Sequence, residues 1–223
     1  MMYDFAPLWL TLKLALITTI VLMCVGIPLA YWLSTTQSRL KYILETLVSM
    51  PLVLPPTVLG FYLLVALGPQ SCVGRFLSLY FDTRLVFTFA GLIVGSVIFS
   101  LPFMVNPIKA AFSSLPSHLS EAAYTLGKSK TTTLFKVLLP NIKPSLLTGI
   151  VMSFAHTIGE FGVVLMIGGN IPSQTKVASI AIFEEVESLN YGAANFYSLI
   201  LIGISFVILL TLYLVNKKTL KII

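Results

Sequence analysis

The chain has 223 residues, of which 57% are apolar and only 10% are charged. A soluble domain has about 25% charged residues, so this composition excludes an ordinary soluble protein and indicates one of the lipid bilayer. The net charge of +6 does not indicate nucleic-acid binding, because the basic residues are scattered through loops without interleaved aromatic residues. Cys24 and Cys72 lack a spacing suited to a metal site or a disulfide framework. We therefore expect no metal, no cofactor and no nucleic-acid partner.

Five apolar stretches follow one another along the chain, each long enough for a membrane-spanning helix of about 20 residues. They are residues 14–33, 46–74, 85–108, 144–175 with Glu160 as an interruption, and 188–216. The first stretch exceeds the apolar part of a cleaved signal, and no Lys or Arg precedes Lys13, so we expect a permanent helix. The sequence predicts an all-α integral membrane protein with five transmembrane helices in one domain, residues 1–223.

Lys and Arg divide unequally between the two sides that five spans create. One side holds ten of them: Arg39, Lys41, Lys109, Lys128, Lys130, Lys136, Lys143, Lys217, Lys218 and Lys221. The other side holds four: Lys13, Arg75, Arg84 and Lys176. Because cytoplasmic loops carry the excess of basic residues, we expect the N-terminus outside and the C-terminus in the cytoplasm. The long cytoplasmic loop is then residues 111–143, and the long outer loop is residues 168–194.

Prolines interrupt two of the apolar stretches. The second contains three within MPLVLPPTVLG, and the third contains Pro102 and Pro107. Each proline removes a backbone donor and clashes with the preceding turn, so we expect both helices to kink or break. Broken backbone at membrane depth persists where protein buries it or water reaches it, which favours a transport pathway over irregular packing. The candidate pathway or gate residues of the second stretch are Pro51, Pro55, Pro56 and Thr57.

Glu160 is the only acid well inside one of these stretches, and a carboxyl group in a membrane is costly enough to suggest a role. His156 stands one helical turn earlier, so the two side chains would share a face and form a pair. Such a pair would serve either a proton relay or, as we favour, a structural contact. The glycines Gly159 and Gly162 would permit close helix approach or local unwinding.

The string AAYTLGKS, residues 122–129, ends like a phosphate-binding P-loop, with Ala122 in place of the first glycine. A P-loop follows a buried strand and works with a second strand that ends in a magnesium-holding Asp. The preceding AFSSLPSHLSE is too polar for a buried strand, and the only aspartates, Asp4 and Asp82, belong to the outer side. We therefore expect that this chain does not hydrolyse a nucleotide.

The same loop fits two short helices at the cytoplasmic surface. We expect Ser117 to cap the first helix, Gly127 to end it in a left-handed conformation, and Ser129 to cap the second. Helical spacing would place four apolar residues of the first helix on one face: Leu119, Ala122, Ala123 and Leu126. The second helix would carry Leu134, Phe135 and Leu138 before Pro140. Such helices would present small residues and a basic rim to a partner.

The loop resembles the EAA loop of permease subunits in ABC importers. Glu121-Ala122-Ala123, then Gly127, then Leu139-Pro140 carry the resemblance, and Val137 stands where the family usually has Ile. In that family a short coupling helix sits in a groove of a separate ATPase. The resemblance implies that these residues couple the chain to an ATPase: Glu121, Ala122, Ala123, Gly127, Leu139 and Pro140.

Two further stretches narrow the resemblance to the molybdate permease branch of that family. They are PLVLPPTVLGFYLLVALGP, residues 51–69, and GEFGVVLMIGGNIP, residues 159–172, which adds Asn170 to the pathway candidates. Sulfate permeases share a similar GEFG and GNI pattern in longer chains, and His156 stands where many relatives carry Arg. The resemblance implies the type I importer permease fold in a bacterial or archaeal inner membrane, importing molybdate or tungstate, with sulfate as the alternative.

The resemblance also implies two permease copies, two cytoplasmic ATPases and an outer binding protein that delivers the oxyanion. The spans agree, because five helices with two of them kinked do not readily enclose a pathway alone. Glu160 has the wrong sign to hold an oxyanion, so selectivity would reside in the binding protein. A proton-coupled carrier using His156 and Glu160 would show internal repeats and several intramembrane charges, which the sequence lacks. A membrane scaffold would leave the coupling loop unexplained.

Overall fold

The computed structural model describes residues 4–220, and within this range the chain forms helices and loops without a strand. The helices of the first half are α1 (Ala6–Thr35), α2 (Leu40–Ser49), α3 (Pro56–Leu67), α4 (Cys72–Phe81) and α5 (Phe89–Ser114). Those of the second half are α6 (His118–Thr125), α7 (Lys130–Thr133), α8 (Leu139–Asn141), α9 (Lys143–Ile158), α10 (Gly162–Gly168), α11 (Ala178–Glu187) and α12 (Tyr191–Leu220). A 3₁₀ turn, η1 (Met50–Leu52), and a π-helical turn, η2 (Leu134–Leu138), complete them. Lys221 lies outside the described residues.

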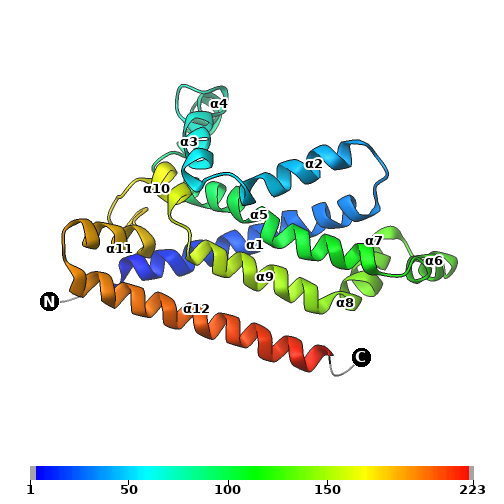
Figure 1. The fold of residues 1–223 in the computed structure, drawn as a ribbon. Helices are drawn as coiled ribbons and strands as arrows, with labels where there is room; N and C mark the ends of the chain where they lie inside the picture. The colour runs from blue at the N-terminus through cyan, green and yellow to red at the C-terminus, as the bar shows by residue number, and fades with distance from the viewer. Residues whose placement is uncertain (1–3, 221–223) are drawn as a thin grey trace.

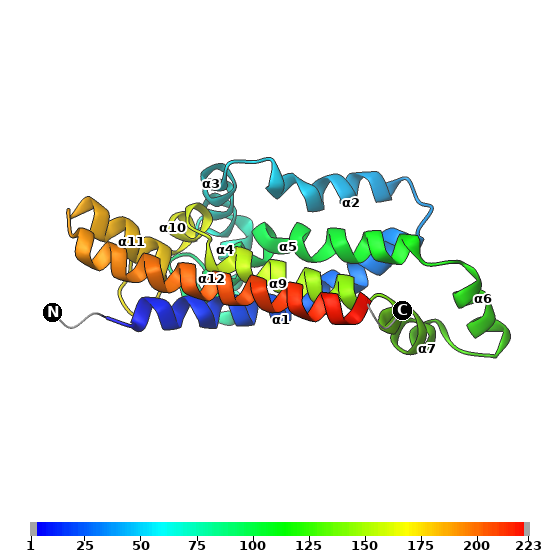
Figure 2. The same ribbon diagram turned by 60° about the horizontal axis from the view of Figure 1, so that its bottom comes forward.

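A bundle of long helices forms the body of the molecule. The helices α1, α5 and α9 pack against one another, and α12 lies along α9 and α11 (Figure 1). Figure 2 shows that α1 begins at the end of the bundle that carries α11, whereas α6 and α7 project at the opposite end, where α12 finishes. The first and last described residues therefore lie at opposite ends of the bundle, as an odd number of membrane crossings requires.

The apolar stretches become three unbroken helices and two interrupted ones. The helices α1, α5 and α12 are each long and apolar enough to cross a bilayer. Two bent pairs raise the number of crossings to as many as five: Leu40–Leu52 meets Pro56–Leu67 at 115°, and Lys130–Asn141 meets Lys143–Ile158 at 83°. The fourth apolar stretch divides between α9, which is short for a span and stops at Ile158, the short helix α10 and the loop that follows it.

The prolines act differently in the two stretches that contain them. In the second, Pro51 lies in η1 and Pro55 is the N-cap of α3, so the expected break occurs there. In the third, no break occurs: α5 continues through Pro102 and Pro107 to Ser114. Both α1 and α9 pack along α5, and such neighbours help a membrane helix to tolerate the two backbone hydrogen bonds that its prolines remove.

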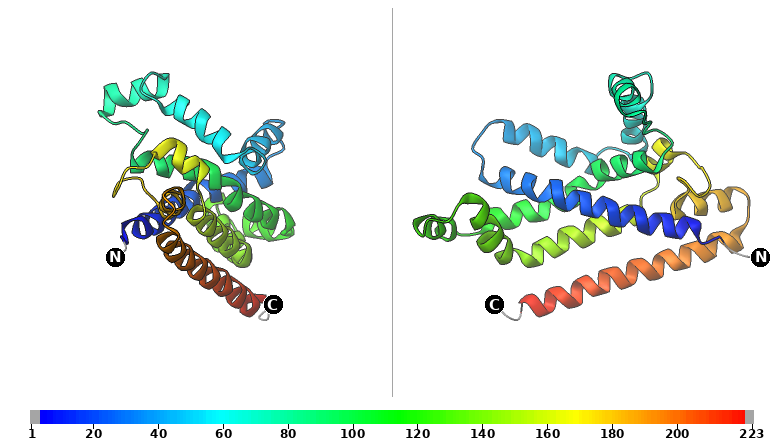
Figure 3. Two further views of the ribbon diagram at one scale, coloured as in Figure 1. Left: turned by 60° about the vertical axis from the view of Figure 1, so that its left-hand side comes forward. Right: turned by 180° about the vertical axis from the view of Figure 1, so that it is seen from behind.

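The buried core extends along the bundle in separate clusters. One joins α1 and α5 to the loop near α6, and includes Leu22, Met104, Ile108 and Leu138. Another, at the α11 end, includes Leu14, Leu92 and Val164. The helices α3 and α4 instead form an arm that projects away from the bundle (Figure 3). Large apolar residues on this arm are exposed within the single chain: Phe61, Tyr62, Val65, Phe76, Leu79 and Tyr80.

Candidate functional site

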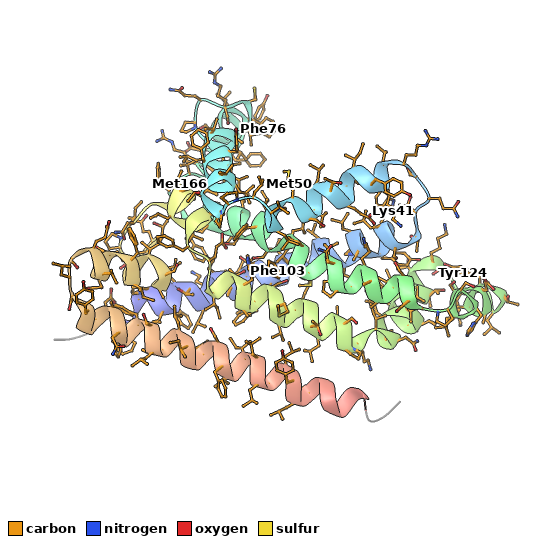
Figure 4. All side chains as sticks on the ribbon, in the orientation of Figure 1. Lys41, Met50, Phe76, Phe103, Tyr124 and Met166 are labelled. Atoms are coloured by element: carbon orange, nitrogen blue, oxygen red, sulfur yellow. The ribbon has the colours of Figure 1, made fainter. Side chains whose placement is uncertain are left out.

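The two helix interruptions meet in space. The N-terminus of α3, which follows the break in the second span, packs against α10, which follows the break after α9. Gly162 makes the approach possible, because a Cβ at this position would lie 2.8 Å from the Cβ of Pro56 and 3.3 Å from the backbone nitrogen of Thr57. Farther along, Gly60 of α3 lies against Met166, which Figure 4 labels beside α3.

A cavity of about 520 Å³ opens where these interruptions meet. Four of the sequence-predicted pathway residues line it: Pro56, Thr57, His156 and Glu160. The structure therefore brings together, from α3 and from the end of α9, residues that stand about a hundred positions apart in the sequence. Phe99 of α5 forms part of the wall. We name this space the elbow cavity.

His156 is held by aromatic rings and by hydroxyl groups. Its ring stacks on Phe103 with 4.0 Å between centroids, and Phe103 lies in the middle of the bundle (Figure 4). Its Nδ1 is 2.9 Å from Ser100 Oγ, which is 3.1 Å from Thr157 Oγ1. Because Thr157 donates to the Ser153 carbonyl oxygen, one consistent direction has Nδ1–H donating to Ser100 and Ser100 donating to Thr157. A neutral imidazole in this tautomer has an acceptor at Nε2, which does not suit an anion.

Glu160 does not pair with His156, so the expected contact is wrong. The helix α9 ends at Ile158, and Glu160 stands in the short link before α10, where helical spacing no longer applies. The side chain is only 3% exposed, and neither carboxyl oxygen makes a hydrogen bond among the described residues. Ser96 is close enough to interact. The carboxyl lies just before the first turn of α10, where the free backbone N–H groups favour negative charge.

The remaining pathway candidates lie apart from the elbow cavity. Pro51 is buried in η1, and Pro55 is exposed at the start of α3. Asn170 is exposed in the outer loop, where it and Lys176 interact with Glu184 of α11. The Lys176 ammonium is 2.5 Å from the Glu184 carboxylate and lowers the pKa of that group. These contacts position the outer loop and do not line the cavity.

A second candidate site is the surface of α6 and of the turn that follows it. Gly127 has φ of +71°, so it ends α6 in the expected left-handed conformation, and the Lys128 N–H donates to the Ala123 carbonyl oxygen at 3.0 Å. Ser129 accepts from the Thr132 N–H at 3.2 Å and caps α7 as expected. Ser117 stands at the N-cap of α6 but makes no capping hydrogen bond through its side chain, so that expectation is wrong.

The apolar residues of α6 divide between two faces instead of sharing one. Leu119 packs against the core cluster and Ala123 is only 6% exposed, whereas Ala122 and Leu126 point outward, with Leu126 76% exposed. The reason is geometric: positions 119 and 123 form one i,i+4 pair, and positions 122 and 126 form another on the adjoining face. The outward pair leaves a small apolar patch at the tip of the molecule.

The segment after α6 is anchored in the bundle core. The second short helix continues through the π-helical turn η2 into α8, so Pro140 lies within helical structure. Leu138 is buried in the core cluster, and Leu139 packs against it. Tyr124 of α6 interacts with Tyr31 of α1 across a cavity of about 270 Å³. Of the predicted coupling residues, Glu121, Ala122, Gly127 and Pro140 are exposed.

One ion-paired cluster, on α2 and α5, was not predicted from the sequence. Glu45 of α2 lies 2.9 Å from Lys109 of α5 and 4.0 Å from Lys41. Glu45 immediately precedes the second apolar stretch, so it did not count as a membrane acid. The spacing of Lys41 and Glu45, one helical turn apart, was a usable signal, but no sequence pattern links either of them to Lys109.

Comparison with known proteins gives matches along almost the whole chain. Residues 11–221 match the family described as binding-protein-dependent transport system inner membrane component. The chain is 46% identical to the molybdenum transport system permease protein ModB of Azotobacter vinelandii, over 95% of this chain and 93% of that protein. It is 34% identical to a putative molybdenum transport system permease protein of Bacillus subtilis, over 96% and 94%. It is 31% identical to a probable sulfate transport system permease protein of Prototheca wickerhamii, over 92% and 79%.

Solved structures share the fold at low sequence identity. A chain of the methionine ABC transporter MetNI in an inward-facing conformation superimposes with a TM-score of 0.72 at 18% identity, over 95% of this chain and 94% of that chain. A chain of a bacterial alginate ABC transporter in complex with its periplasmic protein superimposes with a TM-score of 0.74 at 20% identity, over 93% and 76%. At these identities the similarity concerns the fold alone.

Proposed function

Because the chain belongs to the family of binding-protein-dependent transport system inner membrane components, we propose that it is the membrane-spanning subunit of an importer for molybdate. Tungstate, a near isostere, would follow the same route. The choice of molybdate as the substrate rests on the 46% identity to the molybdenum permease of Azotobacter vinelandii over nearly the full length of both chains. Permease subunits are not enzymes themselves, and ATP hydrolysis would occur on a separate subunit.

The exposed patch of α6 supports the proposal that an ATPase docks at this end of the molecule. Ala122 and Leu126 are apolar and exposed there, with Lys128 and Lys130 close by in sequence. An apolar centre with a charged rim is the usual composition of a protein-docking surface. Since Leu119 of α6 and Leu138 of η2 pack in the core cluster with α1 and α5, a force applied to this loop reaches the spans. We infer that this loop transmits the ATPase movement.

The exposed arm of α3 and α4 supports the proposal that two copies assemble. Its aromatic and aliphatic residues are uncovered in the single chain, and the elbow cavity includes Pro56 and Thr57 at the start of α3. A second copy would enclose the pathway that one bundle leaves open. The outer end, with α11 and the loop before it, would then receive the binding protein.

The elbow cavity supports a role as passage rather than as a tight anion site. Its acidic group, Glu160, offers a dianion no positive charge, and its imidazole has an acceptor in the tautomer described above. Selectivity would therefore come mainly from the binding protein. Sulfate is the second candidate substrate, because the sulfate permease of Prototheca wickerhamii is 31% identical over 92% of this chain.

The deciding experiment is uptake by the complete system in proteoliposomes. The permease, its ATPase and its binding protein are reconstituted with ATP inside, and uptake of labelled molybdate is measured against competing tungstate and sulfate. We expect molybdate uptake that tungstate inhibits at concentrations similar to its own, whereas sulfate inhibits only in large excess. Uptake of sulfate in preference to molybdate would contradict the proposed substrate. A parent complex that moves none of the three ions would contradict the proposed function.

A further inference from the structure

A second cavity lies beside α2, on the other side of the bend that separates α2 from α3. Its volume is about 550 Å³, and its lining includes Glu45, Thr46 and Ser49 of α2 and Lys109 of α5. Figure 4 labels Lys41 and Met50 near opposite ends of α2, and the Lys41 end is the one nearer to α6. The cavity therefore lies between the elbow cavity and the end at which we place the ATPase.

Two lysines share one carboxylate beside this cavity. The Lys109 ammonium donates to Glu45 Oε1 at 2.9 Å, and the Lys41 ammonium lies 4.0 Å from the same oxygen. The side chains of Lys109 and Glu45 are only 28% and 24% exposed. The cluster carries one net positive charge, and a half-buried ammonium in a membrane protein needs an anionic partner. Glu45 supplies that partner in this conformation.

The helix α2, which carries Glu45, is held by fewer buried residues than α5, which carries Lys109. Val48 is the only buried residue of α2, whereas α5 is buried along much of its length. A bend of 115° separates α2 from α3. An element with few buried contacts next to an interruption is where a conformational change costs least. Movement of α2 away from α5 would take the Glu45 carboxylate away from Lys109 and leave that ammonium in need of another anion.

We propose that this cavity is a transient site for the transported dianion, in which Lys109 and Lys41 hold the ion while Glu45 is displaced. Two ammonium groups match the charge of a tetrahedral dianion: Lys109 lines the cavity, and Lys41 stands beside it, 4.0 Å from the lining residue Glu45. Hydroxyl groups at Thr46 and Ser49 line the same space. Glu45 is a built-in competitor that returns to the lysines and releases the ion toward the cytoplasm. A conducting pathway requires such weak sites, because an ion that is held tightly does not leave. This inference rests on the proposed function.

Three variants test the site: Glu45→Gln, Lys109→Met and the double variant. The purified permease–ATPase complex in nanodiscs, without nucleotide or binding protein, is equilibrated with labelled molybdate, and retention of the ion is measured. We expect Glu45→Gln to retain molybdate about tenfold more tightly than the parent, the scale of one charge–charge interaction at a partly exposed site. Lys109→Met and the double variant should retain no more than the parent.

Uptake provides the second readout. Lys109→Met should lower molybdate uptake about fivefold or more, whereas ATP hydrolysis stimulated by the loaded binding protein should stay within about twofold of the parent value, because the ion still reaches the complex. If the Lys109–Glu45 pair only holds α2 against α5, both single variants should assemble less well and Glu45→Gln should retain no molybdate. That result, or uptake at the parent rate in Lys109→Met, would overturn the proposal.

The double variant covers the case in which Glu45→Gln fails to assemble. It removes Lys109 and Glu45 together, so neither of these two charges remains without the other and we expect it to assemble. Its uptake then decides: a loss supports the site and parent-level uptake overturns it. The parent complex separates this inference from the proposed function. If the parent imports molybdate but the variants behave as the parent does, the transient site is wrong and the function stands. If the parent imports no oxyanion, the proposed function is wrong.

Discussion

Gly162 and Pro56 lie in contact where two interrupted spans begin again, and a Cβ on Gly162 would lie 2.8 Å from the Cβ of Pro56. A proline ring is rigid, so it does not move aside as a flexible side chain would. The adjacent backbone nitrogen of Thr57 is 3.3 Å from the same point. The closeness of α3 and α10, and with it the shape of the elbow cavity, depends on the missing side chain.

Gly162→Val should therefore separate α3 from α10. Overfilling a close contact costs about 1–3 kcal/mol, so we expect a lower unfolding temperature for the purified permease and slower uptake. Gly203→Ala is the matched control, because no atom lies within 4 Å of the Cβ it would add. A Gly162→Val protein as stable and as active as this control would show that the contact has no structural importance.

Gly127 should be needed for its backbone conformation and not for space. Its φ of +71° is unfavourable for residues with a side chain, but a Cβ would meet no atom within 4 Å. We expect Gly127→Val to destabilise the end of α6 by about 1–2 kcal/mol, whereas Gly127→Asn should lose less, because Asn tolerates the left-handed region. The measurement is ATP hydrolysis stimulated by the loaded binding protein. Equal activity of the Val and Asn variants would contradict this account.

Glu160→Gln should leave assembly and uptake close to those of the parent. Neither carboxyl oxygen makes a hydrogen bond among residues 4–220, so the amide loses no partner there and replaces a group that is costly to ionise when buried. We expect uptake to be independent of a proton gradient in both proteins, tested by adding a protonophore to the proteoliposomes. If the parent needs the gradient and the variant does not, a proton-coupled carrier becomes the better explanation.

The helix interruptions were predictable only where the local sequence decides the backbone. Pro51 lies in η1 and Pro55 is the N-cap of α3, and together they break the second span. Pro102 and Pro107 remain inside α5, because α1 and α9 pack along it. A proline's missing donor is a local property, but its consequence depends on neighbours that the sequence does not place. The left-handed end of α6 at Gly127 was predictable for the converse reason, since φ is decided within a few residues.

The contacts between distant residues were not predictable in the same way. His156 and Glu160 have the spacing of a helical pair, but the helix ends at Ile158 and the pair does not form. His156 instead contacts Ser100 and Phe103 of α5. Similarly, nothing in the sequence joins Glu45 to Lys109. Such pairs follow from how α2, α5 and α9 pack, which depends on the whole bundle.

The unequal distribution of Lys and Arg predicts which end of the bundle faces the cytoplasm. We expect Lys128→Cys, in a chain with Cys24 and Cys72 replaced by Ala, to react with a membrane-impermeant maleimide only after the cells are permeabilised. Thr83→Cys, in the exposed link between α4 and α5, is the control and should react in intact cells. The reverse pattern would invert the orientation.

The surface of α6 gives the last prediction, which separates docking on an ATPase from being one. Ala122 is exposed and Ala123 is buried against the chain itself, so Trp at these two adjacent positions tests different contacts. Ala122→Trp should leave the purified permease as stable as the parent but weaken its association with the ATPase. Ala123→Trp should overfill the space beneath α6 and destabilise the permease alone by about 1–3 kcal/mol.

Lys128→Ala is the third variant, and it tests whether this loop binds nucleotide. If Lys128 were the lysine of a P-loop, it would contact nucleotide phosphates, and its loss would abolish hydrolysis. As an exposed charge at the rim of a docking surface it contributes about 0–1 kcal/mol, so the variant should hydrolyse ATP nearly as the parent does. Hydrolysis and uptake by the reconstituted complex are measured for all three variants. Normal activity of Ala122→Trp together with complete loss in Lys128→Ala would refute the docking surface, because a P-loop lysine is essential for hydrolysis whereas a rim charge is not.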